Sequence, residues 1–279
     1  MDEKITRLAE GFSGRFGVRF SGINTDFEYS RGAGELYSAA STVKLFCLGL
    51  LLQLCEANRL SLSQKIVLKP EYFEASSGAM GERGVLRELS FGDVLTVRDI
   101  AAMMIIYSDN SATNIIIDMI GGVEKIKEHL GQFGIVRSAV NRRLSEDSAV
   151  YSKSNFGDAT PDDFVKYLKL IYSGKVLSRE YIGIFYELML HQHYKNFFPR
   201  YLPLKENYEN GSGGNVTIAN KTGWQLDARA DVGYLTVGSK MYAYAVLADG
   251  CRDLSNWSEN EGSLLIARLG RIFYDEVCN

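Results

Sequence analysis

The stretch "VTIANKTGWQLDARADVGYLTVGSKMYAYAVLAD", residues 216–249, alternates apolar and polar side chains in three runs. Successive side chains of a β-strand point to opposite faces, so this period of two predicts strands over residues 216–224, 228–238 and 240–249. The connections between the runs are short, and one lies near Gly238-Ser239, which is typical of tight turns. The stretch therefore predicts three antiparallel strands.

The rest of the chain adds two strands and a helical block. The apolar spacing predicts a helix over residues 5–12, strands over 15–23 and 26–30, and a final helix over 259–276. Between residues 42 and 194 the pattern is mostly helical, with predicted helices over residues 42–58, 96–109, 111–122, 123–134, 160–175 and 178–191.

Two early strands and three late ones are most easily combined into one sheet whose ends meet around the helical insertion. We therefore expect an α+β fold, with a five-stranded antiparallel sheet flanked by helices and an inserted all-helical subdomain. The sheet subdomain would comprise residues 1–40 and 211–279, and the helical subdomain residues 41–210. A seam between a sheet and helices is a favoured place for a site.

With 46% hydrophobic and 23% charged residues, the 279-residue chain is typical of a soluble globular protein. The net charge is −3 without blocks of like charge, so neither nucleic-acid binding nor a basic membrane-binding face is expected. The longest apolar runs, residues 45–55 and 101–107, are shorter than the roughly 18 to 20 residues of a membrane span. The start "MDEKITRLAEGF" lacks the apolar run of an export signal. As written, the chain is expected to be a cytoplasmic monomer, and a trimmed mature form would be secreted or periplasmic.

The four cysteines, Cys47, Cys55, Cys251 and Cys278, lack the spacing of a metal site. Cys47 and Cys55 lie about two turns apart on one apolar helix. We interpret all four as small buried hydrophobic residues, and we expect neither a metal nor a cofactor.

The stretch "SAASTVKLFCLGLLLQL", residues 38–54, places a lysine three residues after a serine at the front of an apolar helix. Such a lysine commonly lays its stem along the surface and extends its ammonium into water. Alternatively, residues i and i+3 share a helix face, so Lys44 can reach the hydroxyl of Ser41. An amine in a poorly solvated pocket is easier to deprotonate, and could then accept the proton as the serine attacks. The short pattern alone does not decide between the two interpretations.

Two further motifs favour the chemical interpretation. Ser-Asp-Asn, residues 108–110, lies between two predicted helices, and Lys-Thr-Gly, residues 221–223, lies in the first strand after the insertion. Alone, the first would be an ordinary helix cap and the second a strand end before a turn. In this order and at this spacing, the three motifs together favour a chemical role over three separate structural ones.

These three motifs resemble those of the serine β-lactamases and penicillin-binding proteins, most closely the class A β-lactamases, which combine them around one cleft. The similarity extends over nearly the whole chain and includes "LTVRDIAAMMIIYSDNSATNIIIDMIGG", Thr160-Pro161 and "RADVGYL". The resemblance implies a serine hydrolase of the kind associated with antibiotic resistance. Such an enzyme forms an acyl-enzyme with β-lactams and then hydrolyses it.

The resemblance also implies roles for the residues of the first two motifs. Ser41 would be the acylated nucleophile and Lys44 its proton acceptor, directly or through water. Ser108 would pass the proton to the leaving nitrogen. Asn110 would hold the acyl side-chain amide and help to orient Lys44.

The third motif would bind the substrate. Lys221 and Thr222 would bind the substrate carboxylate, and the strand continuing through Gly223 to Trp224 would pair with the substrate backbone. The oxyanion would lie between the backbone N–H groups of Ser41 and Trp224, where donors already in place stabilise the developing charge.

The resemblance is weaker in the loop before Thr160-Pro161. Class A enzymes carry there a glutamate, followed two residues later by Leu-Asn, that activates the deacylating water. Here "RRLSEDSAVYSKSNFGDATP", residues 142–161, has Glu146 and Asp147 near the right place but no Leu-Asn, with Asn155 as a substitute farther along. Glu146 is the candidate base, although both acids fit equally well as solvated loop residues. Slow deacylation is therefore expected.

Two residues near the third motif also differ from the family pattern or are ambiguous. Trp224 stands where class A enzymes usually have a small or polar residue, and it would narrow the cleft or stack against a flat substrate. Arg229 is a candidate for supporting the carboxylate site, and it fits equally well as a surface arginine on a strand edge.

Other reaction classes are less well supported. A Ser-His-Asp hydrolase could draw only on His129, His191 and His193, which we interpret as structural, and G-x-S-x-G is absent. No cluster of metal-ligand residues supports a metallo-hydrolase. Three functions stay open: hydrolysis of β-lactams, cleavage or transfer at D-alanyl-D-alanine peptides or related amides and esters, and penicillin binding without turnover. Each has a small-molecule or peptide substrate as its partner.

Overall fold

The computed structural model describes residues 1–73, 84–144, 156–204 and 215–278. Its contacts divide the chain into two compact units. The first, here called the sheet unit, comprises Met1–Thr42, Ala159–Lys169 and Tyr194–Asn279. The second, the helical unit, comprises Val43–Asp158 and Leu170–His193. Segments 159–169 and 194–204, which the sequence analysis assigned to the helical subdomain, thus group with the sheet.

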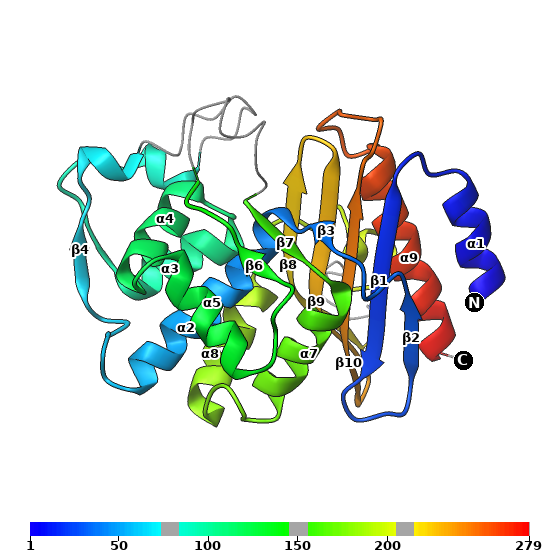
Figure 1. Ribbon diagram of the computed structural model, residues 1–279, viewed down its shortest axis with the longest axis horizontal. Coiled ribbons are helices and arrows are strands. Elements are labelled where there is room, and N and C mark those ends of the chain that lie inside the picture. Colours follow the sequence, from blue (N-terminus) through cyan, green and yellow to red (C-terminus); the bar gives the residue numbers. More distant parts are fainter. Residues whose placement is uncertain (74–83, 145–155, 205–214, 279) are drawn as a thin grey trace. The chain divides into compact units, whose positions relative to one another are not determined.

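The sheet unit contains the expected five-stranded antiparallel sheet, in the order β2-β1-β10-β9-β8 (Figure 1). Its strands are β1 (Arg15–Gly22), β2 (Glu28–Arg31), β8 (Val216–Gln225), β9 (Ala228–Val237) and β10 (Lys240–Asp249). The early strand β1 pairs with the late strand β10 along its whole length, from Arg15↔Asp249 to Gly22↔Tyr242. The prediction that the two ends of the chain build one sheet is therefore confirmed.

Helices cover one face of this sheet and close its core. α9 (Glu261–Cys278) packs on β9 and β10, and α1 (Asp2–Glu10) packs on α9 (Figure 1). Between sheet and helix, the Phe20 and Phe273 rings stack with centroids 4.5 Å apart, and Phe198 of η4 (Phe198–Tyr201) stacks on Tyr244 at 3.8 Å. Burying one such aromatic side chain contributes about 1.5–3 kcal/mol.

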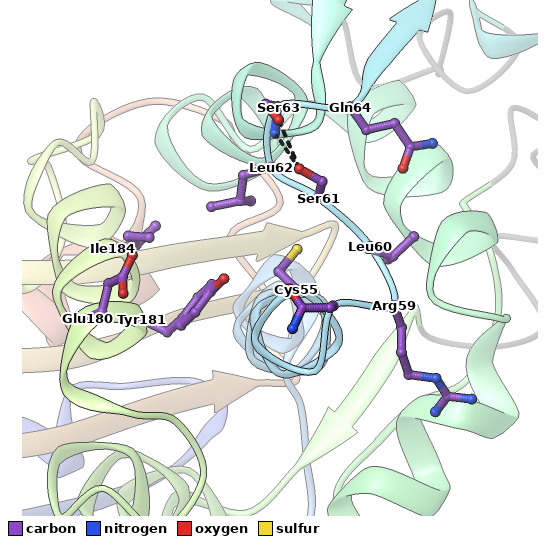
Figure 2. A pocket seen from close by; sticks show the side chains of 11 residues that line it. Cys55, Arg59, Leu60, Ser61, Leu62, Ser63, Gln64, Glu180, Tyr181 and Ile184 are labelled. Atoms are coloured by element: carbon purple, nitrogen blue, oxygen red, sulfur yellow. Dashed lines mark hydrogen bonds between the residues drawn. The ribbon is translucent and has the colours of Figure 1, made fainter.

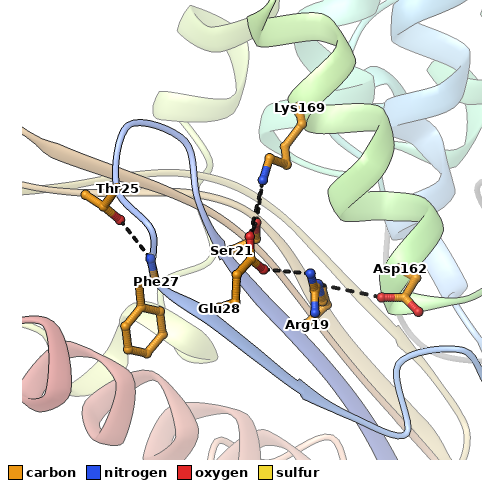
Figure 3. Close-up of polar contacts among 7 residues, drawn as sticks. All are labelled: Arg19, Ser21, Thr25, Phe27, Glu28, Asp162 and Lys169. Carbon is orange, nitrogen blue, oxygen red and sulfur yellow. Dashed lines mark hydrogen bonds and ion pairs between the residues drawn. The ribbon is translucent and has the colours of Figure 1, made fainter.

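A charged network joins the start of α7 (Pro161–Tyr172) to β1 and to the edge strand β2 (Figure 3). Lys169 Nζ donates to Ser21 Oγ at 2.7 Å, and Arg19 pairs with Glu28 at 2.6 Å and with Asp162 at 3.7 Å. Asp162 and Lys169 are seven residues apart and therefore share one helix face. The network fixes the first two turns of α7 on β1 and β2.

The helical unit is built around α2 (Lys44–Glu56). Ten of its thirteen residues are buried, and a helix that is apolar all round belongs in a core. Among the described residues, its other helices include α3 (Val97–Ile106), α4 (Asn110–Met119), α5 (Val123–Gln132), α8 (Arg179–Leu190) and the short η2 (Pro70–Phe73) and η3 (Val85–Glu88). The connection from the sheet unit is β3 (Tyr37–Ser38) followed by η1 (Ala40–Val43).

The prediction of an all-helical subdomain is wrong in one respect. Short strands occur within it or at its border, namely β4 (Lys65–Val67), β5 (Val94–Thr96), β6 (Ala139–Val140) and β7 (Gly157–Ala159). They pair as β4 with β5 and as β6 with β7. Two or three residues are too few to give a recognisable alternation of apolar and polar side chains, so the sequence pattern could not predict them.

The cysteines follow the prediction with one exception. Cys47, Cys55 and Cys251 are buried, whereas Cys278 is exposed at the end of α9, where the last turn of the helix reaches solvent. Within the described ranges, no helix combines the length and the apolar character needed to cross a bilayer.

Candidate active site

Lys44 is the first residue of α2, and its side chain is completely buried. Its Nζ donates to the carbonyl oxygen of Ser108 at 2.5 Å, to Ser108 Oγ at 3.1 Å and to Asn110 Oδ1 at 3.0 Å. The burial excludes the interpretation of Lys44 as a surface lysine. Within the helical unit, the first two sequence motifs thus meet through this one ammonium group.

The turn between α3 and α4 presents Ser108 to the lysine. Ser108 has φ +60°, a left-handed conformation that non-glycine residues adopt at a cost of about 1–3 kcal/mol. The next residue, Asp109, caps α4 by accepting from the N–H of Ala112 at 2.8 Å, and it also accepts from the N–H of Leu86 at 2.8 Å. These two bonds fix the turn, which directs both the carbonyl and the hydroxyl of Ser108 to Lys44.

Ser41 lies in the sheet unit, directly beside β8. It follows Ala40, another non-glycine residue with positive φ (+45°), and is half-buried in η1. A Cβ added at Gly223 would lie 2.9 Å from the Ser41 nitrogen and 3.0 Å from the Ala39 oxygen. Side chains do not tolerate such contacts with backbone atoms, so glycine at 223 lets β8 approach the serine backbone closely.

Lys221 and Thr222 are both completely buried in β8. Lys221 Nζ donates to the backbone oxygen of Thr222 at 2.7 Å. Among the described residues, Thr222 Oγ1 is buried without a hydrogen-bond partner. A buried hydroxyl without a partner costs about 1–3 kcal/mol, which a polar group of a bound substrate could recover.

Trp224 lies near the end of β8, and Arg229, its cross-strand partner, lies near the start of β9. The half-buried Trp224 ring makes an edge-to-face contact with Tyr194, with centroids 5.3 Å apart. The Arg229 guanidinium is buried and donates to the carbonyl oxygens of Gln225, Ala228 and Ser255 at 2.6–2.8 Å. Burial also lowers the pKa of this guanidinium. These bonds hold the β8–β9 turn, and the role of Arg229 toward a substrate carboxylate stays a prediction.

The candidate residues therefore form two groups. Ser41 and residues 221–224 belong to the sheet unit, while Lys44, Ser108 and Asn110 belong to the helical unit. The chain passes from one unit to the other between Thr42 and Val43, within η1. Glu146, Asp147 and Asn155 lie outside the described residues.

The histidines have no catalytic setting. His129 is buried in α5, 3.1 Å from Gln53 Oε1, and burial lowers its pKa to about 4. It is therefore neutral at pH 7. His191 and His193 are exposed. Within the described ranges, no three metal-binding side chains cluster.

A separate cavity of about 590 Å³ lies in the helical unit, between the end of α2, the loop after it and α8 (Figure 2). Cys55, Leu60, Ser61, Ser63, Tyr181 and Ile184 are among its lining residues. None of the predicted site residues within the described ranges lines it.

The sequence analysis did not identify a buried carboxylate on β9, the strand next to β8. Asp231 of β9 is completely buried and bonded to Asn220, Tyr244 and the backbone of Phe198. Only its position between two apolar residues, Ala230 and Val232, could have distinguished it from an ordinary outward-facing acid.

The chain is similar to known proteins over its whole length. The model of a family described as beta-lactamase enzyme family matches residues 1–277. A beta-lactamase of Rhodobacter capsulatus is 26% identical over 191 residues, which cover 68% of this chain and 63% of that protein. An imipenem-hydrolyzing beta-lactamase of Enterobacter cloacae is 28% identical over 177 residues, covering 63% and 58%. The chain thus spans less than two thirds of these relatives' length.

Solved structures share the fold. PBP-A has a TM-score of 0.82 at 22% identity, covering 99% of this chain and 94% of that one. A beta-lactamase from Sphaerobacter thermophilus has a TM-score of 0.83 at 23% identity, covering 99% and 95%. At this identity the likeness shows the α+β fold. Since the family model spans nearly every residue and the three motifs lie in the settings described above, the chain belongs to the beta-lactamase enzyme family.

Proposed function

We propose that the protein is an active-site-serine hydrolase that forms a covalent acyl-enzyme with β-lactams. The observation that supports this best is the buried Lys44, whose three bonds reach Ser108 and Asn110. A lysine held among these uncharged acceptors, three residues after a serine, is suited to exchanging protons during acyl transfer. A surface lysine could not do this.

In acylation, Lys44 acts as the neutral amine: the Ser41 hydroxyl oxygen attacks the lactam carbonyl carbon while its proton passes to the lone pair of Lys44 Nζ. The backbone N–H groups of Ser41 and Trp224 stabilise the oxyanion of the tetrahedral intermediate. The carbon–nitrogen bond then breaks. The Ser108 hydroxyl gives its proton to the leaving nitrogen and regains one from Lys44, which leaves the acyl group as an ester on Ser41.

Substrate recognition is assigned to the third motif. Lys221 supplies a positive charge and Thr222 a hydroxyl without a partner among the described residues, which together suit a carboxylate. Asn110 would hold the amide of the acyl side chain. β-Lactams of the penicillin and cephalosporin types carry both groups.

Release of the acyl group is expected to be slow, because the loop sequence around Glu146 lacks the family's Leu-Asn. Hydrolysis needs a water molecule and a base, and general-base assistance is typically worth about 10² to 10⁴ in rate. The alternative function is acyl transfer at D-alanyl-D-alanine-like peptides, or penicillin binding without turnover. One structural neighbour, a mutant of PBP-A, is described as an acyl-enzyme complex with penicillin G, which favours the acylation half of this proposal.

Time-resolved intact-mass spectrometry with a penicillin tests the proposal. Wild type should gain one penicillin mass rapidly and lose it slowly. Lys44→Ala should acylate about 10² to 10⁴ times more slowly, because the general base is missing. An unchanged acylation rate in Lys44→Ala would contradict the mechanism.

Nitrocefin hydrolysis tests the role of the loop that contains Glu146. Steady-state nitrocefin hydrolysis should be weak after a burst near one equivalent, in wild type and in Glu146→Gln alike. Fast turnover that collapses in Glu146→Gln, with acylation intact, would instead establish an efficient β-lactamase.

A further inference from the structure

A buried carboxylate lies on β9 next to the strand that carries Lys-Thr-Gly. Asp231 is completely buried, and donors from three elements reach it. Asn220 of β8 donates through Nδ2 to both carboxylate oxygens at 2.9 and 3.1 Å, the Tyr244 hydroxyl of β10 donates at 2.9 Å, and the Phe198 N–H of η4 donates at 3.0 Å. Lys195 adds a favourable positive charge.

The bonds to β8 lie beside the substrate-binding pair. Asn220 directly precedes Lys221, and the β8–β9 register pairs Thr222 with Asp231 itself. Among the described residues, the Asn220 side chain has no other hydrogen-bond partner, because its Oδ1 is buried without one. At this point, the side-chain hydrogen bond that connects β8 to β9 is therefore the one between Asn220 and Asp231.

Burying a carboxylate in a protein core is energetically unfavourable. Replacing buried ionic groups with apolar residues of similar size is often neutral or stabilising for the fold. Within the same sheet face, Ile218, Leu235 and Val246 fill comparable positions with apolar side chains. Stability alone does not account for Asp231, whereas fixing the position of β8 does.

We propose that Asp231 is a positioning residue for substrate recognition: through Asn220 it fixes the segment of β8 that presents Lys221 and Thr222 to the substrate carboxylate. The inference rests on the proposed function in one respect, namely that this pair binds a carboxylate. Asp231 itself does not touch the substrate.

The test compares acylation by a penicillin free acid with acylation by its methyl ester. Asp231→Ala and Asn220→Ala each remove the link, and we expect the concentration for half-maximal acylation by the free acid to rise about tenfold. The maximal rate, and all kinetics with the ester, should change less than about threefold. A tenfold loss is what about 1.4 kcal/mol of hydrogen bonding supplies.

Two matched variants separate positioning from loss of stability. Tyr244→Phe removes a donor from the same carboxylate on the side away from β8, so it should preserve the acid-to-ester ratio. Asp231→Asn retains an oxygen that accepts from β8 and should restore most of the ratio. If Asp231→Ala does not fold, Asn220→Ala and Asp231→Asn decide the question.

An acid-to-ester ratio that is unchanged in Asn220→Ala would overturn the inference. Failure of wild type to react with either penicillin would instead contradict the proposed function, and amide hydrogen exchange then tests the positioning directly. Asn220→Ala should accelerate exchange over residues 216–225 relative to residues 15–22, and Tyr244→Phe should not. Equal exchange in both segments would refute the role of Asp231.

Discussion

Replacing Asp231 with asparagine should make the protein more stable at neutral pH. Burial raises the pKa of this carboxyl from its ordinary value of 3.8 to about 6, although hydrogen bonds from Asn220, Tyr244 and Phe198 oppose the rise. The folded state therefore binds the proton more tightly than the unfolded chain. The contribution of Asp231 to the free energy of unfolding should fall as the pH rises from about 4 through about 6, and it should level off at higher pH.

The pKa difference corresponds to about 3 kcal/mol, which is the cost of the buried charge at pH 7. Asparagine has nearly the same shape and removes the charge. With its oxygen in the Oδ2 position, asparagine can accept from both the Phe198 N–H and the Asn220 amide, and its own amide can donate to the Tyr244 hydroxyl, so all three partners keep a bond. We expect the melting temperature at pH 7 to rise by about 5–10 °C.

Thermal unfolding at pH 4.5 and at pH 7 measures this effect. The gain from Asp231→Asn should be largest at pH 7 and about a third as large at pH 4.5, where the folded-state carboxyl is protonated but the unfolded-state carboxyl is already largely ionised. Asp118→Asn, which changes a half-exposed carboxylate paired with Arg143, is the control and should shift the melting temperature little at either pH. A variant that is less stable than wild type at pH 7 would show that the ionised carboxylate stabilises the fold and would refute the reasoning.

Further outcomes follow from close packing. Gly223→Ala would place a methyl group 2.9–3.0 Å from backbone atoms of Ser41, Thr42 and Ala39, so we expect a folded protein that acylates about 10² times more slowly, measured by intact-mass kinetics against wild type. A normal rate would show that β8 and the serine need not approach closely. Phe20→Ala should lower the free energy of unfolding by about 3–5 kcal/mol in urea denaturation, because the ring is buried and stacks on Phe273. A loss below 1 kcal/mol would contradict the packing described for the core.

The main sheet could be predicted because its strands leave a clear pattern. The late strands end within one residue of the bounds that the alternation predicts, and the early strands lie in the same sheet as expected. The strands β4 to β7 could not be predicted, since their pairing depends on contacts between distant segments rather than on local alternation. Cys278 was wrongly expected to be buried because composition cannot tell where a terminal helix leaves the core.

The candidate site was predictable to the extent that its motifs are short and local. The spacing of Ser41 and Lys44 predicted that both lie at the start of one helix. The motif resemblance added Ser108 and Asn110, and in the structure both are hydrogen-bonded to Lys44 Nζ. The three carbonyl partners of the Arg229 guanidinium could not be foreseen, because they come from a turn and a loop. A single buried acid such as Asp231 gives no sequence signal in a strand whose polar residues usually face water.

Acylation of Ser41 is the central claim, and labelling with a fluorescent penicillin tests it most directly. Wild type should incorporate one label per chain, and peptide mapping should locate it on Ser41. Ser63→Ala, which changes an exposed serine in the loop after α2, should label like wild type, and Ser41→Ala should remain unlabelled. Equal labelling of Ser41→Ala and wild type, or a label mapped to another residue, would contradict the account.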